Sequence, residues 1–293
     1  MNQTAVLYAL LLLMVAFWSG NYIGGKIALR EFPALLLAAL RIGIAGLAML
    51  PLYIWERARS TPKKRSRRDV LHLLLLGLIG AALNQLFFIV GLSRTSVAHA
   101  ALLIGLTPVQ VLVIAALRGQ ERVTARKAAG MAIALAGVAV LTSFESSAGS
   151  GATLPGDAIV LLGGFCFALF TVFGKELTGR YSAITVNTYA YVGGGVVLLP
   201  LIFWGAARHY LSHAGAAAWL SAIYMALFPS VAAYLIYYHA LAHMTASRVS
   251  AFSYLQPVFA SIMGVAILGE SLGAAVIAGG VVILSGVYLA ESG

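Results

Sequence analysis

Residues 33–55 read PALLLAALRIGIAGLAMLPLYIW, a run with a single charged side chain. A helix that crosses a membrane needs about 20 predominantly apolar residues, so this run predicts a membrane span. The segment 149 residues further along the chain reads SAITVNTYAYVGGGVVLLPLIFW and repeats the rarest residues at the same places: Pro51 with Pro200, and Trp55 with Trp204. The sequence therefore predicts a helical membrane protein whose two halves are copies of one unit.

The composition of the whole chain agrees with this prediction. Of 293 residues, 61% are hydrophobic and only 10% are charged, and the mean hydropathy is +0.94. A soluble domain carries about 25% charged residues, so a water-soluble globule is excluded. The net charge of +10 would suggest a nucleic-acid partner in a soluble protein, but in a membrane protein it marks cytoplasmic loops. We therefore expect the lipid bilayer as a partner, and no nucleic acid.

Apolar runs separated by charged or Pro/Gly-rich breaks define ten candidate spans. Several connections are only a few residues long, so most neighbouring spans are expected to be antiparallel helices. The apolar stretch after Met1 lacks a positive n-region and is too long for a signal h-region, so we interpret it as a retained span. The ten spans run over 4–24, 33–55, 70–92, 97–117, 127–143, 156–174, 183–205, 218–240, 247–267 and 272–290.

The polar segment 56–69 sets the orientation. It holds seven basic residues close to two span ends: Arg57, Arg59, Lys63, Lys64, Arg65, Arg67 and Arg68. By the positive-inside rule this segment is cytoplasmic, and counting spans from it puts both termini in the cytoplasm. We expect a multi-pass protein of the inner (plasma) membrane.

The offset of 149 also matches Lys26 with Lys175, Pro108 with Pro257 and Glu121 with Glu270. It maps the first five spans onto the last five, which gives units over 4–143 and 155–290. Because five is odd, the second unit must enter the membrane in the opposite sense. Inverted repeats are a transporter architecture whose substrate site lies near mid-membrane between the repeats. The alternative is that a ten-helix bundle has similar loop spacing by accident.

Several short motifs follow one another along the chain: Phe17-Trp18-Ser19-Gly20-Asn21-Tyr22 with Lys26, Leu40-Arg41, Asn84 through Gly91, Thr95-Ser96-Val97-Ala98, Thr107-Pro108, Gly119-Gln120-Glu121-Arg122, Tyr254-Leu255-Gln256-Pro257 and Leu268-Gly269-Glu270. Together they resemble EamA-type members of the drug/metabolite transporter superfamily over nearly the whole chain. The resemblance implies a ten-helix exporter of small metabolites, often amino acids, that works by alternating access. Phe167 and Ala190 stand where the first half has Trp18 and Arg41, so the halves need not contribute equally to a site.

Charged residues inside the spans are rare. Every acidic residue lies at a span end or in a loop, which argues against a mid-span carboxylate that binds a coupling ion and against a paired-carboxylate catalytic site. His99 and His239 are the remaining candidates to carry a proton. Arg41 lies about 12 Å into a span, where an unpaired guanidinium is costly. It is either a counter-charge for a substrate carboxylate or a structural group that caps carbonyls at a helix break.

Polar and aromatic side chains share helical faces at spacings of three and four residues. Aromatic rings mixed with amides and hydroxyls suit a pocket for an amphipathic small molecule, although such residues also join membrane helices. We expect a substrate cavity near mid-membrane. Its candidate residues are Trp18, Asn21, Tyr22, Arg41, Asn84, Phe88, His99, Gln110, Phe167, Thr171, Tyr191, Tyr234, Tyr238, Ser250 and Tyr254.

Other polar residues have predicted structural roles. Pro108 and Pro257 free backbone carbonyls and permit bending, and Glu121 and Glu270 precede helices whose free N–H groups they can cap. Lys26 and Lys175 are expected to snorkel toward the interface. The pairs His209/His213 and His239/His243 have the spacing of a metal site but no third ligand. We expect no metal, no cofactor and no catalytic residue.

These observations predict an all-α integral membrane protein with ten transmembrane helices in two inverted five-helix repeats. The predicted function is export of small metabolites, with amino acids favoured, by alternating access through a central cavity, in a monomer or weak homo-oligomer. Two other functions stay open. A flippase for a lipid-linked intermediate would need a lateral opening and a head-group site, and an integral-membrane enzyme would need a mid-span nucleophile–base or metal set that the sequence lacks.

Overall fold

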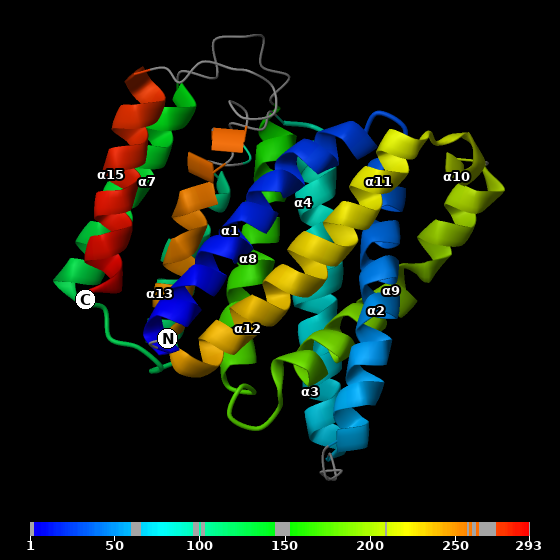
Figure 1. The fold of residues 1–293 in the computed structure, drawn as a ribbon, viewed down its shortest axis with the longest axis horizontal. Coiled ribbons are helices and arrows are strands. Elements are labelled where there is room, and N and C mark those ends of the chain that lie inside the picture. The colour runs from blue at the N-terminus through cyan, green and yellow to red at the C-terminus, as the bar shows by residue number, and fades with distance from the viewer. Residues whose placement is uncertain are drawn as a thin grey trace.

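A computed structural model describes residues 3–59, 66–95, 100, 103–143, 153–208, 210–256, 258–259, 262–263 and 274–292. Within these ranges every regular element is helical (Figure 1). The elements are α1 (Gln3–Ala28), α2 (Ala34–Arg59), α3 (Arg67–Gly77), η1 (Leu78–Leu83), α4 (Asn84–Leu92), α6 (Thr107–Leu117), α7 (Ala125–Ser143), α8 (Leu154–Lys175), α9 (Ala183–Ala207), α10 (Tyr210–His213), α11 (Ala216–Met225), η3 (Ala226–Ala232), α12 (Ala233–His243), α13 (Ala246–Ala251), η4 (Phe252–Leu255) and α15 (Ala274–Glu291).

Six helices of the described residues are long and apolar enough to cross a membrane. They correspond to the first, second, third, sixth, seventh and eighth predicted spans. The helix α6 and the segment 278–290 are apolar but shorter. The fourth and ninth predicted spans lie partly outside the described residues. The short helix α10, in the connection after α9, was not predicted.

Capping residues explain where several helices begin. The side chains of Ser66, Thr153 and Ser182 each accept a hydrogen bond from a backbone N–H in the first turn of α3, α8 and α9. A hydroxyl at this position satisfies one of the N–H groups that a helix leaves free at its start. Pro155 lies in the first turn of α8, where its missing N–H costs nothing. These polar residues therefore fix helix starts that hydrophobic runs alone leave open.

Two long helices contain a π-helical segment at equivalent places. The segment η1 joins α3 to α4, and η3 joins α11 to α12. A π turn contains an extra residue and shifts the faces of the helix on either side. Because η1 and η3 overlap when the chain is shifted by 149 residues, both halves contain the same irregularity.

The helices α2 and α9, which the 149-residue offset relates, pack against each other in opposite directions. Near the end of α2, the Glu56 carboxylate accepts a hydrogen bond of 3.1 Å from Thr185, near the start of α9. Near the other end, Leu36 packs over Gly205. Equivalent helices of the two halves are therefore antiparallel neighbours.

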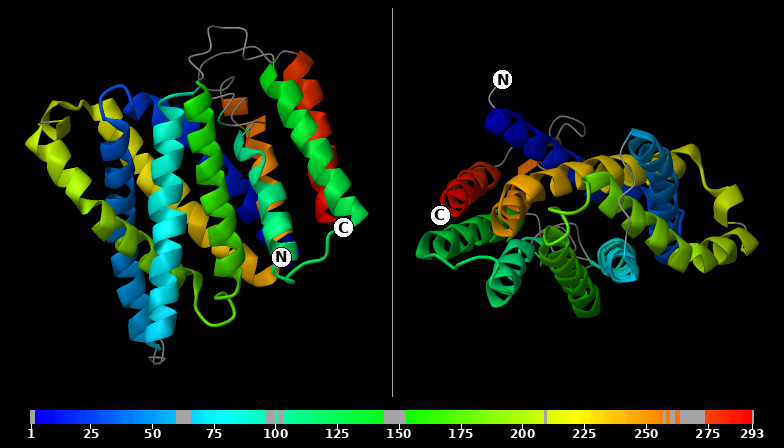
Figure 2. Two further views of the ribbon diagram at one scale, coloured as in Figure 1. Left: turned by 180° about the vertical axis from the view of Figure 1, so that it is seen from behind. Right: turned by 90° about the horizontal axis from the view of Figure 1, so that it is seen from below.

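The helices α7 and α15 form a second such pair, at one edge of the molecule in both views (Figures 1 and 2). Glycines let their backbones touch. A Cβ added at Gly286 would lie 2.7 Å from the carbonyl oxygen of Gly130, and one at Gly137 would lie 3.0 Å from that of Gly279. Small residues at membrane helix contacts allow this close approach.

Lys26 and Lys175 were expected to snorkel toward the interface, and this expectation is wrong. The Lys26 ammonium donates hydrogen bonds to the carbonyls of Leu92 and Thr95. Lys175 donates to Leu241 and Met244, which are the equivalent positions in the second half. Each lysine therefore satisfies carbonyls that a helix leaves free at its C-terminal end.

Candidate functional site

A cavity with a volume of about 70 Å³ lies where the two halves meet. Eight of its thirteen lining residues form four pairs at equivalent positions of the halves: Trp18 and Phe167, Gln85 and Tyr234, Ile104 and Ser253, Thr107 and Gln256. The other five all come from the first half: Asn21, Tyr22, Arg41, Asn84 and Phe88. The cavity is therefore central to the repeat but made unequally by its copies.

Two of these pairs are in direct contact. The rings of Trp18 and Phe167 lie 5.7 Å apart, edge to face. The Gln85 amide donates a hydrogen bond of 2.9 Å to the hydroxyl of Tyr234. Two residues at equivalent positions can touch each other only close to the axis that relates the two halves. These contacts therefore indicate that this axis passes through the cavity wall.

Arg41 is the one charged residue among the described cavity-lining side chains, and it is 1% exposed. Its Nε donates a hydrogen bond of 2.8 Å to Ser230, whose hydroxyl donates to the carbonyl of Met225 beside η3. Its Nη1 is buried and has no hydrogen-bond partner within the described structure. One side of the guanidinium is thus anchored, while the hydrogen-bonding capacity of Nη1 is not used by any residue that the structure describes.

Trp18 holds the aromatic wall of the cavity. Its indole N–H donates a hydrogen bond of 3.0 Å to the carbonyl of Pro229 in η3. Its ring also contacts those of Phe167, Tyr234 and Tyr237, with centroids 5.5–5.9 Å apart. The contacts of Trp18 with Phe167 and Tyr234 are edge to face, which is typical of stable aromatic packing. The wall is therefore preformed.

Two further lining residues carry unsatisfied polar atoms. Asn21 Oδ1 and Thr107 Oγ1 are buried and have no hydrogen-bond partner in the described part of the chain. A buried polar atom without a partner costs about 1–3 kcal/mol. With Arg41 Nη1, the cavity therefore combines an unused charged donor with an unused amide acceptor, next to apolar rings.

Eight of the predicted site residues line the cavity: Trp18, Asn21, Tyr22, Arg41, Asn84, Phe88, Phe167 and Tyr234. Others lie on the expected helices but not in its wall. Tyr191 is fully buried behind Tyr234, with rings 5.6 Å apart. Tyr238 donates to the carbonyl of Phe170, Thr171 is hydrogen-bonded to Tyr237, and Ser250 donates to the carbonyl of Ser247.

Gln110 and Tyr254 also stand outside the wall, although each has a buried polar atom without a partner in the described structure. The prediction that both would line one cavity is therefore corrected: helical spacing gives the face of a residue but not its depth. His99, Pro257 and Glu270 lie outside the described residues.

The sequence-based site missed five lining residues: Gln85, Ile104, Thr107, Ser253 and Gln256. Gln256 accepts a hydrogen bond of 3.3 Å from Tyr22, and its backbone carbonyl accepts one of 3.0 Å from Ser19. Thr107 and Gln256 stand in the same motifs as Pro108 and Tyr254, which gave a signal that could have found them.

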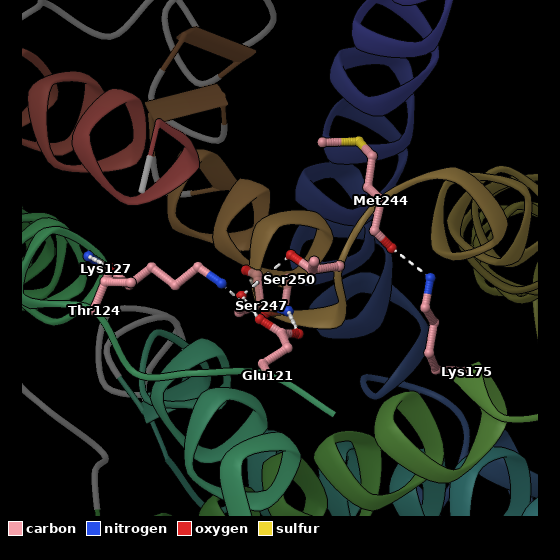
Figure 3. Close-up of polar contacts among 8 residues, drawn as sticks. Glu121, Thr124, Lys127, Lys175, Met244, Ser247 and Ser250 are labelled. Atoms are coloured by element: carbon pink, nitrogen blue, oxygen red, sulfur yellow. Dashed lines mark hydrogen bonds and ion pairs between the residues drawn. The ribbon is translucent and has the colours of Figure 1, made fainter. Parts of the chain in front are cut away.

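Glu121 closes a polar network between the halves (Figure 3). Its carboxylate accepts hydrogen bonds from the backbone N–H and hydroxyl of Ser247, at the start of α13, and from the ammonium of Lys127 at 2.9 Å. It therefore caps a helix of the other half and not the next helix along the chain. Burial raises the pKa of Glu121, but these hydrogen bonds outweigh it and hold that pKa below its ordinary value.

Pro108 starts a helix instead of bending one. It lies in the first turn of α6, after a break at residues 105–106.

The His239 and His243 rings are 4.6 Å apart, with His243 Nδ1 2.8 Å from the His239 carbonyl. Among the residues that the structure describes, no group of three or more His, Cys, Asp or Glu could hold a metal ion.

The family model of the EamA-like transporter family matches residues 5–143 and, a second time, residues 154–291. The chain belongs to this family. It is therefore a multi-pass membrane transporter with a two-repeat architecture, as the motifs around Trp18 and Pro108 predicted.

Relatives in this family are named as transporters. A protein of Archaeoglobus fulgidus named "Uncharacterized transporter" is 30% identical over 96% of both chains. A protein of Streptantibioticus cattleyicolor named "Probable terminal-alkyne amino-acid exporter" is 29% identical over 88% of this chain and 87% of its own. A crystal structure at 17% identity has the same fold, with a TM-score of 0.76 over 98% of this chain and 97% of that one.

Proposed function

We propose that the protein exports small metabolites that carry a carboxylate, with amino acids as the favoured class. The observation that carries this proposal is Arg41, whose buried Nη1 has no partner in the described structure although the residue lines the cavity. A carboxylate would supply the missing acceptor, and guanidinium binds carboxylates strongly. The amino-acid exporter among the relatives supports the same class.

Asn21 supports an amino acid over a simple acid. Its unpartnered Oδ1 can accept a hydrogen bond from a substrate ammonium. The faces of Trp18, Tyr22 and Phe88 in the same wall attract a cation as well. The aromatic wall also suits an apolar side chain. No acidic residue stands among the described lining residues, so the substrate ammonium would be held by neutral groups.

The proposed architecture is ten spans in two inverted repeats, over 4–143 and 155–290. An axis in the membrane plane relates the two repeats, and their relative movement opens the cavity to one side of the membrane and then to the other. Equivalent helices related by such an axis run antiparallel where they meet, whereas an axis along the membrane normal would make them parallel. The antiparallel pairs α2/α9 and α7/α15 support the first relation.

The proposed location is the inner membrane, with both termini in the cytoplasm. In Figure 1, α1 begins and α15 ends on the lower side, where α2 also ends and α3 begins. That side carries the described basic residues at the end of α2 and the start of α3, Arg57, Arg59, Arg67 and Arg68, which the positive-inside rule assigns to the cytoplasm.

The test is amino-acid counterflow in proteoliposomes. Arg41→Gln should lower transport about 10- to 100-fold, because a hydrogen bond to a charged group is worth about 1.5–3 kcal/mol and 1.4 kcal/mol is tenfold. Arg41→Lys should retain part of the activity, since it keeps the charge and loses the fork. Ser230→Ala is the control for the anchor and should have the smaller effect. Asn21→Leu should impair an amino acid more than the 2-hydroxy acid with the same side chain.

Unchanged transport by a folded Arg41→Gln variant would contradict the proposal and assign Arg41 to structure. Failure to move any amino acid, together with transfer of a labelled lipid-linked intermediate across the same vesicles, would favour the flippase instead.

A further inference from the structure

A second hollow lies on the outside of the helix bundle, between α2, α3 with η1, and α9. It has a volume of about 570 Å³, and hydrocarbon dominates its lining. Leu71 and Val196, in this lining, are 58% and 66% exposed. On α9 the lining runs from Thr188 to Val197, which is about 14 Å of helix. This apolar groove therefore faces the membrane and follows the direction of its helices.

Basic residues continue the groove at one end. On α2, Arg57 lies one and two turns beyond the lining residues Tyr53 and Leu50, on the same face, and its guanidinium lies 5.9 Å from the centre of the Tyr53 ring. On α3, Arg67 shares a face with the lining residues Leu71, Leu74, Leu75 and Leu78. Both arginines are exposed.

The nearby acidic groups have other partners. Glu56 accepts a hydrogen bond from Thr185, and Asp69 is hydrogen-bonded to Ser66 and lies 3.7 Å from Arg180. The charge at this end of the groove is therefore positive, next to a hydrophobic channel.

We propose that the groove binds one anionic phospholipid, with an acyl chain between the helices and its phosphate on Arg57 and Arg67. Hydrocarbon matches the leucine and valine lining, and basic residues where a span meets the interface attract anionic lipid head groups. This proposal requires a membrane location but does not depend on the transported substrate.

The second half of the chain provides an internal comparison. Ala206 and Ala216 stand at the positions equivalent to Arg57 and Arg67, and Ile44 stands at the position equivalent to Gly193 in the groove. The charged end and the small residue that opens the channel therefore belong to one copy only. A lipid site built on the shared scaffold alone would have kept both.

A second copy of the chain is the competing occupant. In an antiparallel dimer at this groove, the basic ends of the two copies would lie far apart, so nothing would neutralise them. In a parallel dimer, Arg57 and Arg67 would lie close to the same residues of the other copy, and like charges would repel. Charge complementarity favours the lipid.

The experiment is native mass spectrometry of the full chain in detergent, with phosphatidylglycerol and phosphatidylcholine of identical acyl chains. The wild type should bind phosphatidylglycerol more tightly. Arg57→Gln and Arg67→Gln should each lower this preference about fivefold, the value of about 1 kcal/mol per basic residue. Arg122→Gln, an exposed arginine of the loop before α7, is the matched control and should leave the preference unchanged.

Gly193→Leu tests the channel. A Cβ there would lie 3.1 Å from the flexible end of Leu74, so the added side chain should fill the groove and weaken binding of both lipids. An Arg122→Gln effect equal to that of Arg57→Gln would overturn the proposal in favour of general surface charge. Gly193→Leu with unchanged lipid binding and a loss of dimer mass would overturn it in favour of a second copy. Arg57→Gln changes an exposed side chain, so it tests the head-group site even where Gly193→Leu fails to fold.

Discussion

Two regions of the molecule differ in how far the two copies of the unit use the same residues: the ends and irregularities of the helices, and the wall of the cavity. Lys26 and Lys175 cap equivalent helix ends with the same side chain, and η1 and η3 repeat the same irregularity. In the cavity, each of the four pairs of equivalent lining residues consists of two different residue types. The position equivalent to Arg41 in the second half is Ala190. The lysine caps and the π segments are therefore duplicated, whereas the residues that line the cavity are not.

This contrast is a guide to the role of a residue that needs no second sequence. A residue whose packing contact recurs in both copies is needed twice. A ligand without two-fold symmetry needs its charged partner only once. Arg41 in α2, whose buried Nη1 has no partner among the described residues, stands in one copy only, whereas Gly130, Gly137, Gly279 and Gly286 form two equivalent pairs.

The largest expected effect concerns the Glu121 network, which is not duplicated, since Val276 and Ala98 replace Lys127 and Ser247 in the other copy. Glu121→Gln should lower the free energy of unfolding by about 3–5 kcal/mol, because Lys127, 8% exposed, loses the partner that offsets its burial. Equilibrium unfolding in mixed micelles measures this change.

The same variant should alter the pH profile. The pKa of Glu121 is lower in the folded protein, so its stabilisation is complete above about pH 4.3, the ordinary value, and is lost as the pH falls through the folded-state pKa.

Arg118→Gln is the control for the loss of stability. It removes an ion pair whose arginine is 49% exposed and should cost at most about 1 kcal/mol. Equal losses for the two variants would remove the special status of the network.

A smaller effect is expected at the duplicated glycines of α7 and α15. Gly286→Leu and Gly137→Leu should each cost about 3 kcal/mol, the upper end for overpacking, because a backbone carbonyl occupies the space. The two losses should be equal. Gly179→Leu, where an added Cβ would meet nothing within 4 Å, is the control, and a matching loss there would show that the contact is not responsible.

The smallest of these effects is expected at the two lysine caps. Lys26→Met and Lys175→Met should each cost about 1.5 kcal/mol, the lower value for hydrogen bonds to a charged group, because methionine keeps the packing of the stem. Unfolding of both variants under one set of conditions gives the comparison. A loss at one lysine and none at the other would break the equivalence of the copies at this point.

The sequence predicted the helices better than their contacts. The run 33–55 corresponds to α2 (Ala34–Arg59), because hydrophobic length is a local property. The π segments could not be predicted, since no residue in Leu78–Leu83 differs from those of an ordinary apolar helix. This segment bears on the site, because Asn84 and Gln85, which line the cavity, begin the helix that follows it. The extra residue changes the face on which both lie relative to α3.

Depth was the other missing property. Tyr191 and Tyr234 were both predicted from their helical faces, but only Tyr234 lines the cavity, because its ring lies in front of Tyr191. Which of two rings stands in front depends on how the helices pack against each other, which a helical face read from the sequence does not give. Trp18 and Arg41 line the cavity, as expected of side chains that are costly in lipid wherever their helices pack, and their role in substrate binding stays a prediction.

The contact between Trp18 and Phe167 bears on how far a transported molecule would travel. In the alternating access proposed above, each repeat would adopt the conformation of the other, and Trp18 and Phe167, whose ring centres lie 5.7 Å apart, would stay in contact because they lie where the halves meet. The helices would then tilt around these two rings. A molecule bound against them would stay at one depth, and the aqueous entrance would move from one face of the membrane to the other.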